Sequence, residues 1–191
     1  MKKSFSVLIV WLFIAGTGIA QNRKINMDSS ITTSHQVTIK GQRISYTATA
    51  GKQPVWDEKG RPIAGLFYIY YEKTGVTDRA TRPLVISFNG GPGAASCWMH
   101  LGYTGPRRLT IDDEGYPVQP YGIQENPNSI LDVADIVYIE PVNTGFSRAA
   151  SDSVPKSTFF GVNADIKYLA DWISTFVSRK NRWTSAKYLV G

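Results

Sequence analysis

The residues of this chain that are best suited to chemistry form one glycine-rich stretch, Asn89–Gly93. It follows Leu84–Phe88, an apolar run that predicts a buried strand, and its glycines and proline prevent the strand from continuing. Glycines leave backbone N–H groups with no side chain in front of them, and such groups stabilise an oxyanion, a phosphate or a carboxylate. A plain tight turn is the alternative, because Asn-Gly is the commonest hairpin dipeptide.

Nucleotide binding is one chemistry that the sequence argues against. Residues Gly91–Ser96 match only half of the dinucleotide-binding pattern, since the third glycine is absent and Pro92 falls inside it. No Gly-Lys-Ser or Gly-Lys-Thr follows, which a phosphate-binding P-loop requires. We therefore expect no nucleotide, no other cofactor and no metal.

The single cysteine and the two histidines do not form a catalytic pattern either. Cys97 has no cysteine partner within the chain, and we interpret it as a small buried hydrophobe after the glycine stretch. Only His35 and His100 are available as bases, and neither lies in a cysteine-peptidase motif. His100 is close to the glycine stretch in sequence, but a structural role is its better interpretation.

Composition places the chain among ordinary globular domains. Its 191 residues allow one domain with a real core, and 42% hydrophobic against 19% charged residues exclude the disordered and fibrous classes. The net charge of +6 comes from scattered lysines and arginines, with no run long enough for a nucleic-acid surface. Nucleic acid is therefore not an expected partner.

The N-terminus has the pattern of a secretory signal peptide, which we assign to residues 1–20. Two lysines precede a short apolar run, and small residues lead to a cleavage point after Ala20. The apolar run is shorter than the roughly 20 residues of a membrane span. We therefore expect export to a bacterial periplasm or medium, with no stable membrane anchor. Residues 21–34 predict a loose lead-in to a domain over residues 35–191.

The elements that must position the glycine stretch lie on both sides of it. Residues 35–73 alternate between apolar and polar positions, with glycine-containing turns, and predict an antiparallel meander. Residues 94–101 predict a short helix, and Asp112–Gly115 is the turn of a predicted small hairpin. A second buried strand is predicted over residues 134–140.

A change of apolar period predicts a helix over residues 162–180, with Asn163 as N-cap. Its predicted apolar face consists of Val162, Ile166, Leu169, Ala170, Ile173, Phe176 and Val177. A last strand is predicted over residues 186–190. This order requires crossover connections and predicts an α/β fold, in which antiparallel strands lead into a mostly parallel sheet. Such an arrangement is the entry of an α/β-hydrolase fold, here incomplete.

Four motifs of the chain resemble those of the serine carboxypeptidase family of α/β-hydrolases. They are Asn89–Gly93, Gly105-Pro106, Glu125–Ser129 and Asp135–Ser147, and residues 160–191 are similar to the family's helix and the strand before its nucleophile. One glycine motif alone is a weak signal, but four motifs in the family's order are specific. Gly105–Arg108 and the two lysines of the leader resemble the bacterial branch.

The resemblance implies roles for three residues of the glycine stretch. Gly91 takes the place of the glycine whose backbone N–H binds the tetrahedral oxyanion. Asn89, through its side chain, and Gly90, through its N–H, match the groups that bind the free carboxylate of the substrate's last residue. The implied activity is hydrolysis of the C-terminal peptide bond through an acyl-enzyme, with peptides that carry a free C-terminal carboxylate as substrates.

The resemblance also implies where the nucleophile belongs. In the family, a Gly-x-Ser-x-Gly elbow follows the strand that Lys187–Val190 represents, and the aspartate and histidine come later. Gly191 matches the first glycine of that elbow. The serines within the chain lack this context; they are Ser87, Ser96, Ser147 and Ser151. We therefore expect the chain to be an N-terminal fragment without the Ser-Asp-His triad, inactive by itself.

Two positions depart from the family pattern. Tyr103 stands where many relatives carry a glutamate that helps to bind the product carboxylate in acid, so no acid preference is expected. Ala94 stands where relatives often carry a disulfide cysteine, so that bridge is not transferred. Arg107 and Arg108 are interpreted as solvated surface charge. Two alternatives stay open, namely a secreted non-catalytic binding protein and an acyltransferase relative.

Overall fold

The computed structural model describes residues 26–89 and 93–191. Three of the sequence predictions fall outside these ranges: the signal peptide at residues 1–20, the carboxylate-binding role of Gly90 and the oxyanion role of Gly91. Of the helices in the described part of the chain, none has the length and apolar character that crossing a membrane requires.

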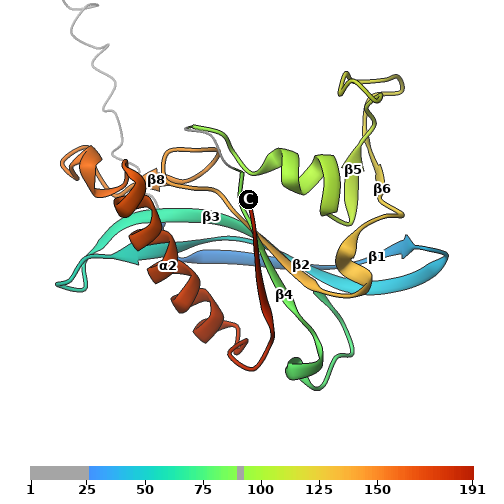
Figure 1. Ribbon diagram of the computed structural model, residues 1–191, viewed down its shortest axis with the longest axis horizontal. Coiled ribbons are helices and arrows are strands. Elements are labelled where there is room, and N and C mark those ends of the chain that lie inside the picture. Colours follow the sequence, from blue (N-terminus) through green and yellow to red (C-terminus); the bar gives the residue numbers. More distant parts are fainter. Residues whose placement is uncertain (1–25, 90–92) are drawn as a thin grey trace, which may run out of the picture.

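Three long strands form the antiparallel half of the sheet (Figure 1). They are β1 (Ser29–Ile39), β2 (Gln42–Trp56) and β3 (Pro62–Lys73), as the alternation predicted. The loose lead-in predicted for residues 21–34 is wrong from Ser29 onward, because β1 pairs with β2 along its whole length. All side chains from Ser29 to Gln36 are exposed, so no apolar alternation marks this part of the strand in the sequence.

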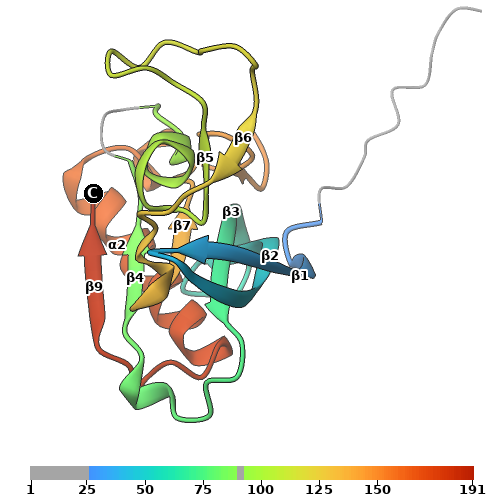
Figure 2. The same ribbon diagram turned by 90° about the vertical axis from the view of Figure 1, so that its right-hand side faces the viewer.

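Three shorter strands form the parallel half. The strand β4 (Leu84–Ser87) lies between β7 (Asp135–Ile139) and β9 (Lys187–Val190) and runs parallel to both (Figure 2). The order across the sheet is β1-β2-β3-β7-β4-β9, and the short β8 (Arg148–Ala149) pairs with β3. The predicted class is confirmed: antiparallel strands lead into parallel ones, as in the first part of an α/β fold.

The helix α2 (Val162–Arg179) packs against the sheet with a face that includes the predicted Leu169, Phe176 and Val177 but not Ala170, which is exposed. Its buried residues are Tyr168, Leu169, Trp172, Phe176 and Val177. Val162 and Ile166 are 77% and 61% exposed, so their placement on the buried face is wrong. The aromatic rings of Tyr168 and Trp172 lie on the buried face instead, because an aromatic ring buries more apolar area than an aliphatic side chain.

The ends of α2 also differ from the prediction. Gly161 is the N-cap and makes no side-chain hydrogen bond, so the prediction of Asn163 as N-cap is wrong. Gly161 has φ = 129°, a backbone conformation that only glycine adopts readily, and it marks a sharp entry into the helix. Asp165 lies in the first turn and Arg179 in the last, which suits the helix dipole.

The remaining elements are short. They are η1 (Arg79–Thr81), η2 (Trp98–Thr104), β5 (Arg107–Leu109), β6 (Ile123–Glu125), η3 (Ile130–Asp132) and η4 (Lys156–Thr158). The strands β5 and β6 pair with each other and project from the molecule beside η2 (Figures 1 and 2). Ile111 bridges Pro117 around the predicted Asp112–Gly115 turn, which confirms a small hairpin there.

Apolar side chains form a core on each face of the sheet. The core that includes α2 contains Leu66, Leu84, Ile86, Val137, Ile139, Trp172 and Phe176 among its buried members. The other contains Val37, Ile39, Ile44, Tyr71, Val85, Leu131 and Ile136. Every residue of β4 and β7 is buried, as predicted for strands covered on both faces.

A buried ionic cluster lies where the parallel strands begin. Asp135, the first residue of β7, accepts hydrogen bonds from Arg82 Nε at 2.7 Å and from Arg182 Nη1. Arg182 also donates to the Tyr70 hydroxyl at 3.0 Å and to the carbonyl of Arg82 at 2.8 Å. Arg82, Asp135 and Arg182 are all buried, so this network joins the start of β7 to the segments that precede β4 and β9 inside the protein.

Candidate functional site

The chemistry-bearing edge of the sheet is the one at which β4, β7 and β9 end. Ser87 and Val190 are partners in the parallel register, and the Phe88 N–H donates to the Val190 carbonyl at 3.1 Å. A Cβ atom added at Gly191 would lie 3.3 Å from Phe88 Cε2, so the chain after β9 lies beside the chain after β4. Ligand sites in open α/β sheets lie at this carboxyl edge of the strands.

Asn89, the first residue of the predicted site, is held at both its main chain and its side chain. Its backbone N–H donates to Ser96 Oγ at 3.1 Å. Its side-chain Oδ1 accepts from the Met99 N–H at 3.2 Å. Because that partner is a donor, the oxygen of the amide must face it, and the Nδ2 group is directed elsewhere. Nδ2 makes no hydrogen bond to any residue in the ranges 26–89 and 93–191.

Ser96 connects this loop to the neighbouring strand. It is 2% exposed, and its hydroxyl donates to the Ile139 carbonyl at the end of β7 at 2.5 Å. The same oxygen accepts from Asn89, so one buried side chain joins the ends of β4 and β7. The sequence interpretation considered Ser96 only as a nucleophile and missed this role, because its partner Ile139 is 43 positions distant.

Comparisons with known proteins fit this geometry. Residues 42–189 match the model of the serine carboxypeptidase family, Peptidase_S10. The chain belongs to the serine carboxypeptidase family. It is 31% identical to serine carboxypeptidase-like 45 of Arabidopsis thaliana over 90% of this chain and 36% of that protein. It is 33% identical to serine carboxypeptidase-like 36 of the same plant over 62% of this chain and 24% of that protein.

A solved structure shows the same fold. The crystal structure of Kex1(Δ)p, a prohormone-processing carboxypeptidase from Saccharomyces cerevisiae, is similar to 75% of this chain with a TM-score of 0.53 and 22% identity. The match covers 30% of that protein. The chain therefore spans between a quarter and about a third of the length of the relatives named here.

The three other serines named in the sequence analysis of this serine carboxypeptidase family chain differ in their surroundings, and Ser87 is the last residue of β4. Ser147 Oγ donates to the Glu140 carbonyl at 2.6 Å and accepts from the Phe67 N–H at 2.8 Å. Ser151 is exposed and shares a hydrogen bond with Ser153. Ser87 is buried within β4, and its hydroxyl has no partner among the described residues.

His100 has the structural role that the sequence suggested. It is 8% exposed, its Nε2 lies 2.6 Å from the Tyr71 hydroxyl, and its ring packs 4.7 Å from that of Tyr138. Burial disfavours the charged form and lowers the pKa of His100 to about 4. A histidine that stays neutral and is enclosed by tyrosine rings is not placed to activate a serine in the described part of the chain.

The helix that follows the glycine stretch is shorter than predicted at its start. Residues 94–96 return toward the sheet, because Ser96 bonds to both strand ends, and η2 begins only at Trp98 as a π-helix. The prediction that Cys97 is buried is wrong: Ser96 points inward, and the cysteine beside it at the N-cap of η2 is exposed.

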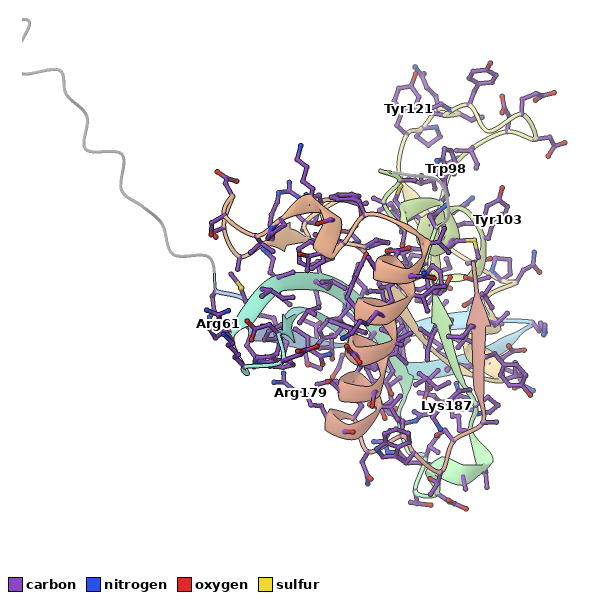
Figure 3. All side chains as sticks on the ribbon, turned by 60° about the vertical axis from the view of Figure 1, so that its left-hand side comes forward. Arg61, Trp98, Tyr103, Tyr121, Arg179 and Lys187 are labelled. Atoms are coloured by element: carbon purple, nitrogen blue, oxygen red, sulfur yellow. The ribbon has the colours of Figure 1, made fainter. Side chains whose placement is uncertain are left out.

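Aromatic side chains stand exposed around this helix. Trp98 is 47% exposed and Tyr103 is 66% exposed, and both lie on η2, near the end of β9 (Figure 3). Tyr121 is 70% exposed on the projecting hairpin above them (Figure 3). Tyr103 thus presents a phenol to the surface.

The turn after β7 carries a carboxylate that the sequence did not single out. Glu140 is half-buried and accepts from the Phe146 N–H at 2.5 Å. Burial, partly offset by this hydrogen bond, raises the pKa of Glu140 above its usual range. Gly145 has φ = 43° and lies against the carboxylate, so the turn fits only glycine there.

Two hollows of the surface lie away from Asn89. A cavity of about 450 Å³ between the β2–β3 turn and α2 is lined by residues that include Trp56, Arg61 and Lys167. A larger groove shares Trp56 and includes Asn143 and Arg148. Neither includes Asn89. Within residues 26–89 and 93–191 no group of acidic, histidine or cysteine side chains is arranged to hold a metal ion.

Proposed function

We propose that the complete protein containing this chain is a serine carboxypeptidase that hydrolyses the last peptide bond of peptides with a free C-terminal carboxylate. The observation that carries the proposal is the placement of Asn89, two residues after the end of β4, the strand that pairs with β9, with its amide held by the Met99 N–H. Membership of the serine carboxypeptidase family supports the reaction type. An exopeptidase needs donors for a terminal carboxylate, because that group distinguishes the end of a peptide from its middle.

In this proposal three consecutive residues share the recognition of the substrate. Asn89 Nδ2 and the Gly90 N–H donate to the carboxylate, and the Gly91 N–H donates to the oxyanion that forms on the scissile carbonyl. Neutral donors suit both tasks, since they are already oriented and need not be desolvated as charges. Glycine at the last two positions lets the backbone approach the substrate.

The nucleophile in this proposal is a serine that follows Gly191 in the longer polypeptide. Its hydroxyl oxygen attacks the carbonyl carbon, and the last residue leaves as an amine that takes up the proton of the hydroxyl. Water then hydrolyses the acyl-enzyme, which releases the shortened peptide and restores the serine. The chain of 191 residues would then bind a terminal carboxylate without hydrolysing peptides. Tyr103 stands in place of the glutamate to which the family resemblance attributes an acidic optimum. We therefore expect no acid preference in the pH–rate profile.

The test uses the full-length protein and a blocked dipeptide with either a free C-terminal carboxylate or a C-terminal amide. We expect hydrolysis of the first that a serine-directed inhibitor blocks. Asn89→Ala should raise KM for it roughly 10- to 100-fold, the effect of losing a hydrogen bond to a charged group. Asn128→Ala, at an exposed asparagine of another turn, should not.

Three results of this experiment would contradict the proposal. Equal hydrolysis of the acid and the amide would contradict recognition of a terminal carboxylate. Binding without hydrolysis by the full-length protein would favour a binding protein. Transfer of the acyl group to an alcohol in place of water would favour an acyltransferase. Export, which we also propose, predicts a mature N-terminus at Gln21 in the protein recovered from its host.

A further inference from the structure

We propose that Ser96 is a positioning residue for the carboxylate-binding amide of Asn89. The inference rests on the function proposed above and extends it to a side chain that would not touch the substrate. Its starting point is that the Ser96 hydroxyl is buried and bonded on both sides, to the Asn89 N–H at 3.1 Å and to the Ile139 carbonyl at 2.5 Å.

The direction of both hydrogen bonds is fixed by their partners. The Ile139 carbonyl can only accept, so the Ser96 hydroxyl proton must point to it. The Asn89 N–H can only donate, so a lone pair of the same oxygen faces it. A hydroxyl that donates and accepts at once is polarised, and each bond strengthens the other. Ser96 therefore holds the main chain of Asn89 at a defined place relative to the end of β7.

The side chain of Asn89 is oriented from the same segment of the chain. Met99, three positions after Ser96, donates its N–H to Asn89 Oδ1. One anchor fixes the backbone of Asn89 and the other fixes which end of its amide is turned inward. With Oδ1 occupied, Nδ2 is the group left to meet a carboxylate. If the Ser96 anchor is lost, the Asn89 backbone can move, and Nδ2 loses its placement.

The chain contains a matched serine that makes the same kind of connection without contact to Asn89. Ser147 is 0% exposed and joins the Glu140 carbonyl to the Phe67 N–H, on the other side of β7. Replacing either serine with alanine removes one buried hydroxyl and leaves one donor and one acceptor without a partner. A general loss of packing would affect both variants equally, whereas a positioning role would separate them.

The experiment compares Ser96→Ala and Ser147→Ala in the full-length protein, again with the blocked dipeptide acid and its amide. We expect Ser96→Ala to lower the preference for the acid about tenfold, mostly through KM. Ser147→Ala should be destabilised to a similar degree in thermal unfolding but should keep the preference. Equal losses of preference in the two variants would overturn the inference.

A double variant tests whether Ser96 acts through Asn89. In the Asn89→Ala background, Ser96→Ala should cause no further loss of preference, because the group that it positions is already absent. Independent losses that multiply would contradict the inference. If Ser96→Ala does not fold, Ser96→Cys replaces it, since a thiol nearly preserves the volume but donates and accepts weakly.

A second readout does not depend on activity. Amide hydrogen exchange at Asn89 should become faster in Ser96→Ala and stay unchanged in Ser147→Ala. Unchanged exchange at Asn89 in both would overturn the inference whatever the kinetics show. If the wild-type protein hydrolyses neither peptide, the proposed function fails, and exchange still decides whether Ser96 holds Asn89. If the wild type prefers the acid and Ser96→Ala keeps that preference, only the positioning role fails.

Discussion

Asp135 and Arg182 form an ion pair in which both side chains are 1% exposed, although the two residues are 47 positions apart in the sequence. The pair lies where β7 begins, at the opposite end of the strand from Ile139 and the Asn89 loop. Arg82 shares the same carboxylate. The carboxylate thus balances two guanidinium groups inside the protein, and the backbone carbonyls of Leu131, Ala134 and Arg82 accept further N–H groups of the two arginines.

Asp135→Asn should be among the most destabilising single substitutions in the chain. It would leave two buried guanidinium groups without their shared anion, which costs about 3–5 kcal/mol of unfolding free energy. Asp171→Asn breaks only the exposed pair with Lys167 and should change stability by less than about 1 kcal/mol. Denaturant unfolding measures both, and similar values for the two variants would contradict the assignment.

Trp172 and Ile166 provide a test of which face of α2 is buried. Trp172 is 1% exposed, stacks on Phe176, and exchanges hydrogen bonds with the main chain and side chain of Gln53. Trp172→Ala should cost about 3–5 kcal/mol, as for other buried aromatic residues. Ile166→Ala removes an exposed side chain and should stay within about 0.5 kcal/mol. A larger loss of unfolding free energy in Ile166→Ala than in Trp172→Ala, measured by chemical denaturation, would support the face predicted from the sequence.

His100 should make stability depend on pH on the acid side of neutrality. Its pKa is about 4 in the folded protein and near 6.5 when unfolded, so the unfolded chain binds more protons between these values. The contribution of neutral His100 to the unfolding free energy is complete above pH 6.5. It is lost as the pH falls toward 4, by up to about 3 kcal/mol. His100→Gln should flatten the dependence of the unfolding free energy on pH in this range. Equal slopes in wild type and His100→Gln would refute this.

Gly105 ends η2 in a position with no room for a side chain. A Cβ atom there would overlap the His100 carbonyl oxygen and lie 3.0 Å from the His100 ring. Gly105→Ala should therefore cost about 1–3 kcal/mol through displacement of the helix end. Gly122 has nothing within 4 Å of an added Cβ and no positive φ, so Gly122→Ala should be neutral or slightly stabilising. Calorimetry of the two variants gives the comparison.

The fold could be predicted largely because its signals are local. Alternation identified β2 and β3, and the short apolar runs of β4 and β7 marked strands buried on both faces. The face of α2 was predicted only in part, because only aliphatic positions and Phe176 were counted, while Tyr168 and Trp172 can bury a large ring and still satisfy a polar atom.

The candidate site could be predicted only where a motif carries it. Asn89 was identified from its place after a buried strand, and the structure puts it beside the end of β9. The role of Ser96 could not be found in the same way, because Ile139, its other partner, is 43 positions distant. The pairing of Asp135 with Arg82 and Arg182 was missed for the same reason: a charged residue in a sequence gives no sign of a distant buried partner.

The parallel pairing of β4 and β9 sets a length scale for the proposed reaction. Neighbouring strands lie about 4.8 Å apart, and one extended residue spans roughly 3.3–3.6 Å. Asn89 and Gly191 leave these two strands at the same edge. A peptide whose C-terminal carboxylate binds at Asn89 would therefore place only its last peptide bond over the residues that follow β9. The spacing between the two strands would therefore restrict cleavage to the removal of one residue at a time.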